Sequence, residues 1–289
     1  MKRLNINCVV YFAIVITTIG FCTSSFSAVP KGHAQPRSYL ELPKLREFST
    51  APYVLERRGK RKHLIVIGSR HERDPNSSML DGIEELFNRI RPEVVIHESF
   101  VPEQLKTMPR DQAIRVGADL GFAVYLAGRY DAQIRSGDAP EKAEFKALLA
   151  AHTAEEVFVF LTGQRLIGSV RNPDLKIAQA EYSKFYLEYL VKNGIPKRDD
   201  WSQWNGFLES YKRVVGKPFT RESWGPIFVN PTVNATRLNQ VARTSDVVRD
   251  RFLLAAIHKA LKDHDRVVVV FGSWHVLALE PVLNELVVE

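Results

Sequence analysis

The chain has 289 residues, of which 45% are hydrophobic and 25% charged, and its formal net charge is +7. This is the composition of an ordinary globular protein, long enough for one large domain or two small ones. Its densest basic stretch, ERRGKRKH at 56–63, is interpreted as a solvated hairpin turn, so no nucleic-acid partner is expected.

Residues 1–28 have the three parts of a secretory signal peptide. Two basic residues precede an apolar run at 8–21, and small residues follow at 23–28. The apolar run is short for a membrane span, so we expect cleavage and a secreted or periplasmic protein with no stable membrane span. An uncleaved N-terminal anchor is the alternative. Cleavage would remove both cysteines of the chain, and with them any disulfide or thiolate metal site.

The rest of the chain predicts an α/β domain over residues 51–289, preceded by a linker at 29–50. The expected elements are strands at 53–55, 63–67, 94–100, 131–135 and 266–271, and helices at about 79–90, 110–129, 245–261 and the C-terminus. The first two strands form a hairpin around Gly59. Alternation of strands and helices after it is typical of a parallel sheet with right-handed crossovers.

Residues from about 139 to 243 interrupt this alternation. They contain three helix-like segments and no convincing strand. The predicted fold is therefore a central, mostly parallel sheet with an N-terminal β-hairpin, flanking helices and a long helical insertion.

The motif Gly-Ser-x-His occurs twice, as IGSRH at 67–71 and FGSWH at 271–275, each time at the end of an apolar run. If the strands are parallel, His71, Glu98 and His275 all leave the sheet at its carboxyl edge, where ligands bind in open α/β sheets. Two imidazoles and a carboxylate suit a divalent metal such as Mn, Co or Zn, which can activate a bound water. The alternative is that each is an ordinary polar residue at a strand end.

Arg249 is expected near the start of its helix, where a cation opposes the helix dipole, and on the face that should be buried. A cation in such a position needs an anionic partner, either an active-site carboxylate or a substrate group. A local pair with Asp246 or Asp250 is the alternative. Asp138, after the third parallel strand, and Glu72, beside His71, are accessory candidates.

In its order of motifs the sequence resembles the superfamily of TraB/PrgY, Tiki, GumN-like, erythromycin-esterase and ChaN-like proteins. The residues that carry the resemblance are Gly68 with His71, Glu98, the pair Arg249-Asp250, and Gly272 with His275. The resemblance implies an α/β fold, and Tiki-like members are metal-dependent proteases. It would make His71, Glu98 and His275 the metal and catalytic set, with Arg249 assisting. The chain differs in having Asp250 where Asn is common and in lacking a clear Asp-Arg pair after the third strand.

Three functions follow as expectations. The first is a secreted metal-dependent hydrolase, peptidase-like, with Glu98 as ligand or base and Arg249 on the developing negative charge. The second is a metal-independent, esterase-like hydrolase with a histidine base. The third is haem or ligand binding of the ChaN-like type. Its pocket would be lined by the aromatics of the helical insertion, Tyr182, Phe185, Tyr186, Tyr189, Trp201 and Trp204, which we expect to be core residues.

We predict that exported protein begins close to residue 29, because the basic, apolar and small-residue regions all lie before it. N-terminal sequencing of the exported material tests this. A sequence that begins at Met1 would contradict the prediction and favour the uncleaved anchor.

Overall fold

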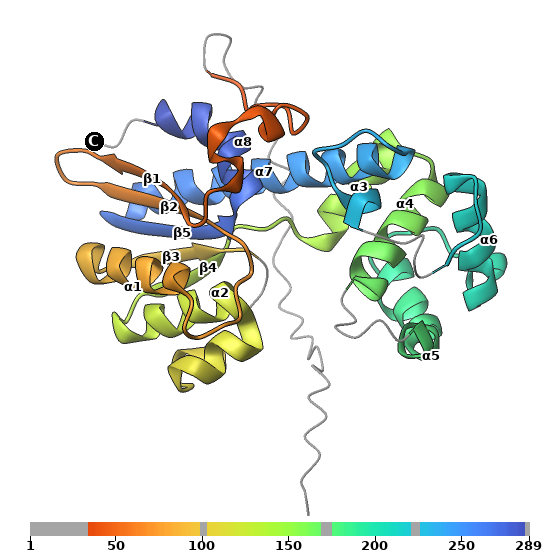
Figure 1. Cartoon of the computed structure of the whole chain (residues 1–289), viewed down its shortest axis with the longest axis horizontal. Coiled ribbons are helices and arrows are strands. Elements are labelled where there is room, and N and C mark those ends of the chain that lie inside the picture. Colours follow the sequence, from red (N-terminus) through yellow and green to blue (C-terminus); the bar gives the residue numbers. More distant parts are fainter. Residues whose placement is uncertain (1–33, 99–102, 169–174, 221–225, 287–289) are drawn as a thin grey trace, which may run out of the picture. The chain divides into compact units, whose positions relative to one another are not determined.

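The computed structural model describes residues 34–98, 103–168, 175–220 and 226–286 (Figure 1). Among them is a five-stranded sheet in the order β1-β2-β5-β3-β4. The strands are β1 (Tyr53–Arg58), β2 (His63–Ser69), β3 (Val94–His97), β4 (Gln133–Ser136) and β5 (Arg266–Gly272). Only the β1–β2 pair is antiparallel; β2, β5, β3 and β4 run parallel. The expected α/β fold with an N-terminal hairpin and a mostly parallel sheet is confirmed.

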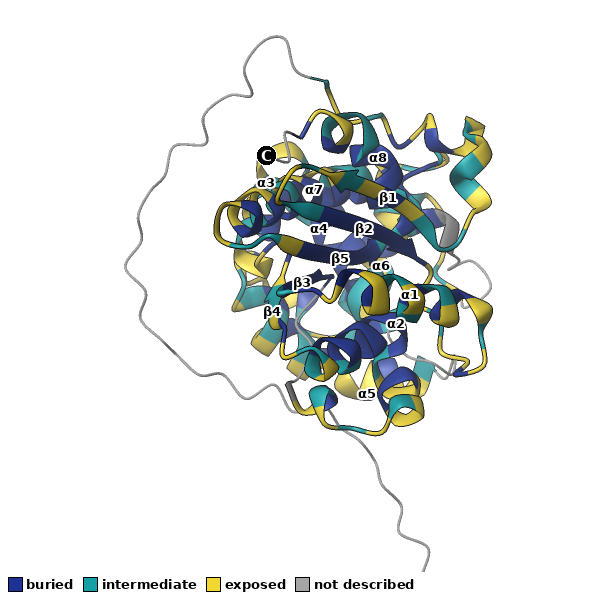
Figure 2. Ribbon diagram, turned by 90° about the vertical axis from the view of Figure 1, so that its left-hand side faces the viewer, coloured by how far each residue is buried: buried dark blue, intermediate teal, exposed yellow. Residues whose placement is uncertain are grey.

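Helices cover both faces of the sheet, and successive side chains of each strand enter different cores. On one face, alternate strand residues such as Ile65 and Val268 join a core with α1 (Ser78–Ile90) and α2 (Arg110–Arg129). On the other, their neighbours join a core with α7 (Arg237–Asp263) and α8 (Ser273–Asn284). The inner strands appear dark blue between these layers in Figure 2. Burial on both faces explains why the strands read as continuous apolar runs.

The expected helical insertion has a core separate from the two on the sheet faces, and no strand is found among the described residues between 139 and 243. Its helices are α3 (Glu141–Ala151), α4 (Ala154–Leu161), α5 (Leu175–Phe185) and α6 (Trp204–Val215), with π-helical turns η4 (Thr162–Ile167) and η5 (Tyr186–Val191) and 3-10 turns η6 (Asp199–Trp201) and η7 (Pro226–Val229). Phe158 stacks on Trp201 at its centre, with ring centroids 4.4 Å apart. The 3-10 turn η3 (Glu103–Lys106) precedes α2.

Helix α7 contributes to both cores. Leu238 and Val241, near its start, pack in the core of the helical insertion, whereas Leu253 and Ile257 pack on the sheet. The residues between them on the same side of the helix are polar, yet they too are buried: Ser245, Asp246, Arg249 and Asp250. The buried stripe of α7 is therefore apolar at both ends and charged where the two cores meet.

The expected start of this helix at Ser245 is wrong. The helix begins at Arg237, and Thr236 and Asn239 form its capping box. Arg249 consequently lies in the interior of a 27-residue helix, so the argument from the helix dipole does not apply to it. Its burial has to be explained by its partners instead.

The described part of the segment expected as a linker, residues 34–50, is structured. It forms the 3-10 turns η1 (Leu42–Lys44) and η2 (Arg46–Ser49) and packs against α8, where Phe48 stacks on Trp274. The expected signal peptide at 1–28 lies outside the described residues. Of the helices that the structure describes, none is both long and apolar enough for a membrane crossing.

The two Gly-Ser-x-His motifs lie side by side at the carboxyl edge of the sheet, because β2 and β5 are adjacent and Ser69 pairs with Gly272. A methyl group on Gly68 would come within 2.9 Å of the Cα atom of Ser273. The first glycine is therefore required by the close approach of the second motif, since real Cβ atoms do not tolerate that distance.

We predict that Gly68→Ala lowers the free energy of unfolding by about 1–3 kcal/mol, because the added methyl overpacks the β2–α8 contact. The matched control is Gly82→Ala in α1, where the new methyl would meet nothing closer than Pro52 at 3.9 Å. This control should raise stability by about 0.5–1 kcal/mol through helix propensity. Urea unfolding of both variants is the measurement; equal effects of the two substitutions would contradict the packing argument.

Candidate functional site

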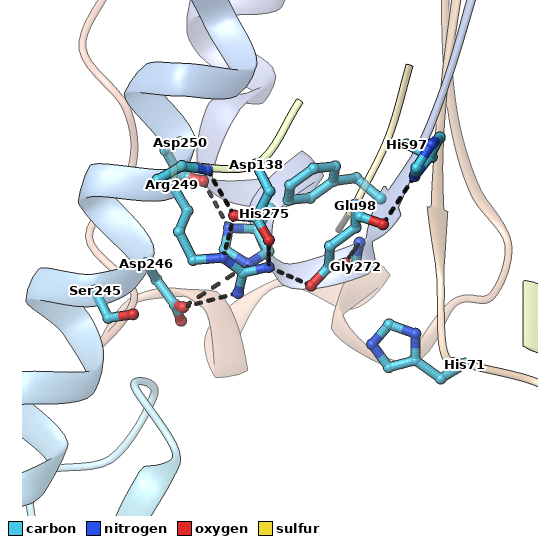
Figure 3. Close-up of polar contacts among 12 residues, drawn as sticks. His71, His97, Glu98, Asp138, Ser245, Asp246, Arg249, Asp250, Gly272 and His275 are labelled. Atoms are coloured by element: carbon cyan, nitrogen blue, oxygen red, sulfur yellow. Dashed lines mark hydrogen bonds and ion pairs between the residues drawn. The ribbon is translucent and has the colours of Figure 1, made fainter. Parts of the chain in front are cut away.

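The guanidinium of Arg249 is the centre of a buried polar network at the carboxyl edge of the sheet (Figure 3). Its Nε and Nη2 donate to the two oxygens of Asp138 at 2.7 and 3.1 Å, and Nη2 also donates to Oε1 of Glu98. Nη1 lies 3.6 Å from Asp246, one turn earlier on α7. Only 8% of Arg249 is exposed. Three carboxylates from three chain segments therefore hold one buried cation.

Glu98 directly follows β3, which ends at His97, three residues before the end expected from the sequence. Its Oε2 accepts a hydrogen bond from the backbone N–H of Gly272 at 2.8 Å. Burial alone would raise the pKa of Glu98, but the charges of Arg249, His275 and His71 outweigh it and hold the pKa at about 2. Glu98 is therefore an ionised carboxylate with both oxygens engaged.

His275 lies in the first turn of α8 and is 6% exposed. Its Nδ1 is 2.7 Å from Oδ1 of Asp250 and 2.8 Å from the hydroxyl oxygen of Tyr39. The same hydroxyl donates its proton to Asp250 at 3.0 Å. Burial disfavours a charged imidazole, yet Asp246 and Asp250 raise the pKa of His275 to about 9. The ring is therefore an imidazolium at neutral pH, and its Nε2 lies 3.3 Å from Nη1 of Arg249.

Asp246 completes the anionic surroundings of the imidazolium. Its Oδ1 is 3.8 Å from Nε2 of His275. Burial raises the pKa of Asp246 to about 6, against the lowering effect of His275 and Arg249. As the pH falls, Asp246 therefore takes up a proton well before Glu98 does.

His71 is exposed to solvent, unlike Arg249 and His275, with 55% of its side chain accessible. It has a left-handed backbone (φ 58°), and its N–H donates to Oδ2 of Asp119 at 2.9 Å. Its Nδ1 lies 3.5 Å from the other oxygen of Asp119, a residue with no exposed surface on α2. The hydrogen bond to Asp119 raises the pKa of His71 more than burial lowers it, and Glu98 raises it further. His71 therefore has an oriented imidazole that solvent can reach.

The other sequence candidates have different places. Asp138 is part of the network around Arg249, as the sequence suggested for an accessory group. Glu72 is not: its carboxylate accepts backbone N–H groups of Arg73 and Asp74 in the loop after His71. His97 is buried, and its ring bonds to the backbone oxygen of Glu98.

Two residues of the site, Tyr39 and Asp119, were not among the sequence candidates. Tyr39 belongs to a segment without helical or strand periodicity, so nothing in the sequence joins it to α8. Asp119 follows Ala118, whose non-helical backbone (φ 55°) interrupts α2. The helical spacing of apolar residues at 110–129 gives no sign of that interruption. A residue other than glycine with positive φ is strained, and such residues cluster at functional sites.

The donor atoms of this arrangement do not fit a divalent metal ion. His275 uses Nδ1 for Asp250 and Tyr39, and its Nε2 faces a guanidinium, while both oxygens of Glu98 already accept hydrogen bonds. An ion bound to these atoms would have to displace Arg249. Within the described residues, no group of three or more His, Cys, Asp or Glu side chains has metal-binding geometry. The expected metal, Mn, Co or Zn, stays a prediction, and no step below uses it.

The aromatic residues considered for a haem pocket belong to the core of the helical insertion. Tyr182, Tyr186 and Trp201 are almost wholly buried, and Phe185, Tyr189 and Trp204 pack against them. This agrees with the expectation that they are core residues.

No protein-family model matches the chain, and no curated protein matches it either. The likeness to the TraB–Tiki superfamily therefore remains a resemblance in the order of its motifs.

We predict that the network makes stability depend on pH through His275. Because its pKa in the folded protein is about 9, above its ordinary value of 6.5, the stabilisation is complete below pH 6.5 and is lost as the pH rises through 9. Urea unfolding of the wild type and of His275→Gln between pH 6 and 10 tests this. The difference between the two should shrink with rising pH, and an exposed histidine variant, His258→Gln, should follow the wild type throughout. A difference that stays constant with pH would contradict the prediction.

Proposed function

We propose that the protein is a metal-independent hydrolase of esterase type, acting on an acyl bond at the carboxyl edge of the sheet. The observation that carries the proposal is the pairing of a solvent-accessible histidine, His71 with Asp119, with a buried cationic pair, Arg249 and His275. An accessible base next to fixed positive charge is what hydrolysis of an ester requires.

His71 is the general base of the proposed reaction. Asp119 orients its ring through Nδ1, which leaves Nε2 to accept a proton from water. The hydrogen bond to Asp119 raises the pKa of His71 above its ordinary value, which makes the neutral imidazole a stronger base. The hydroxide equivalent then adds to the acyl carbon.

Arg249 and His275 stabilise the oxyanion formed by that addition. Their positive charges are fixed in place before substrate arrives, because Glu98 and Asp138 hold the guanidinium and Asp250 holds the imidazolium. A preorganised charge of this kind stabilises a developing oxyanion without reorganisation during the reaction. When the intermediate collapses, the bond between the acyl carbon and the alcohol oxygen breaks and the alcohol takes the proton from His71. The products are a carboxylic acid and an alcohol.

The expected signal peptide and the resemblance to a superfamily that includes esterases both support this proposal. With the signal peptide cleaved, the enzyme would act in a secreted or periplasmic compartment. A metal-dependent, peptidase-like activity is the second candidate, because the Glu98 and His275 atoms that would bind the metal already contact Arg249.

We predict that His71→Ala lowers kcat/KM by about 10²–10⁴-fold on p-nitrophenyl acetate and butyrate, because the water loses its base. Activity of the wild type should be unchanged by a chelator. His258→Ala, an exposed histidine on α7, is the matched control and should retain full activity.

Two results would count against the proposal. One is the absence of hydrolysis of either ester by the wild type. The other is loss of hydrolysis with a chelator and its return with Mn, Co or Zn, which would restore the metal-dependent reading.

A further inference from the structure

The π-helical turn η4 (Thr162–Ile167) in the helical insertion holds polar groups that the fold does not satisfy. Among the described residues, six buried side-chain nitrogen or oxygen atoms have no hydrogen-bond partner, and three of them belong to this turn: Thr162 Oγ1, Gln164 Oε1 and Arg165 Nε. Buried polar atoms normally have partners, and π-helical turns occur frequently at functional sites. This concentration of unpartnered atoms makes η4 a candidate for a binding element.

Arg165 connects η4 to the network around Arg249. Its Nη2 donates to Glu144 at 2.9 Å, and the other oxygen of Glu144 accepts the hydroxyl of Ser245 at 2.5 Å. Ser245 lies one turn before Arg249 on the same side of α7. The position of Arg165 is therefore fixed relative to the proposed catalytic residues by a chain of three side chains.

The guanidinium of Arg165 is only partly covered. Its side chain is 32% exposed, whereas that of its partner Glu144 is 2% exposed. Burial and the charge of Arg249 lower the pKa of Arg165. Glu144, Tyr189 and Asp138 raise it by more, so the guanidinium stays charged. Arg165 is thus a fixed cation within electrostatic reach of Asp138 and Arg249, with donors that the described protein does not use.

We propose that Arg165 binds a carboxylate group of the substrate, so that the preferred substrate is an ester that carries a second, free carboxylate. This inference rests on the proposed esterase function for its chemistry. A guanidinium matches a carboxylate with two parallel N–H···O bonds, and Glu144 occupies only one nitrogen of Arg165. The substrate carboxylate would bind the solvent-accessible part of the Arg165 guanidinium, while its ester group lies at Arg249 and His275.

The first measurement uses binding alone. Glutarate should bind the wild type in calorimetric titrations, and Arg165→Gln should weaken that binding about 10- to 100-fold, as expected for loss of a charge-assisted pair. Because Arg165→Gln leaves Glu144 buried without its cation, the double variant Glu144→Gln, Arg165→Gln serves as a check that folding is not the cause. Arg165→Lys keeps a cation beside Glu144 but loses the paired donors of a guanidinium, and it should also weaken binding. Arg213→Gln, which removes an exposed pair with Glu155 in the same helical region, should bind glutarate like the wild type.

The second measurement compares two esters, mono-p-nitrophenyl glutarate and p-nitrophenyl butyrate. Arg165→Gln should raise KM for the charged ester about 10- to 100-fold and leave the neutral ester unaffected. Hydrolysis of neither ester, with glutarate binding that depends on Arg165, would defeat the proposed function and leave the carboxylate site standing. Equal glutarate binding by the wild type and Arg165→Gln, or none by either, would overturn the site whatever the activity.

Discussion

Burial of the Arg249 guanidinium is the constraint on which the site depends. A cation inside a protein is tolerated only where carboxylates and hydrogen bonds replace its water. Here Glu98 follows β3, Asp138 follows β4, and Asp246 belongs to α7 itself. Removal of Arg249 would leave these buried carboxylates without their shared cation, at a cost of about 3–5 kcal/mol. The network therefore fixes how the ends of two strands meet the middle of α7.

The same region also requires chain segments to approach one another closely at three glycines. Gly68 admits the start of α8, and a methyl group on Gly272 would come within 3.2 Å of Oε2 of Glu98. A methyl on Gly137 would lie 2.8 Å from both Ile96 and Leu253, so this glycine lets the segment that carries Asp138 lie against the sheet. The repeated Gly-Ser-x-His motif thus reflects packing of two strand ends against each other, and the two histidines lie in different local structure. His71 stays in an exposed loop, whereas His275 enters a buried helical turn.

Much of the fold and most residues of the site could be predicted from the sequence. Apolar runs that end in polar residues identified the parallel strands and placed Glu98, Asp138 and both histidines at one edge. What could not be predicted depends on tertiary contacts. Tyr39 reaches His275 from a segment with no periodicity, and Asp119 reaches His71 through a break in α2 that apolar spacing does not reveal. The start of α7 was misplaced because its buried stripe continues into a different core.

The buried charges in the middle of α7 are not needed to join the two cores. An apolar stripe running unbroken from Leu238 to Ile257 would join the two cores without any charge to bury, and replacement of buried ion pairs by apolar residues is often neutral or stabilising. Instead the chain holds four carboxylates, a guanidinium and an imidazolium there, with one aspartate titrating at about 6 and the histidine at about 9. Protons in such a network move when a charge is added beside it. A stripe built only to hold the cores together has no need of that property, whereas the proposed hydrolase site, where charge would develop during the reaction, does.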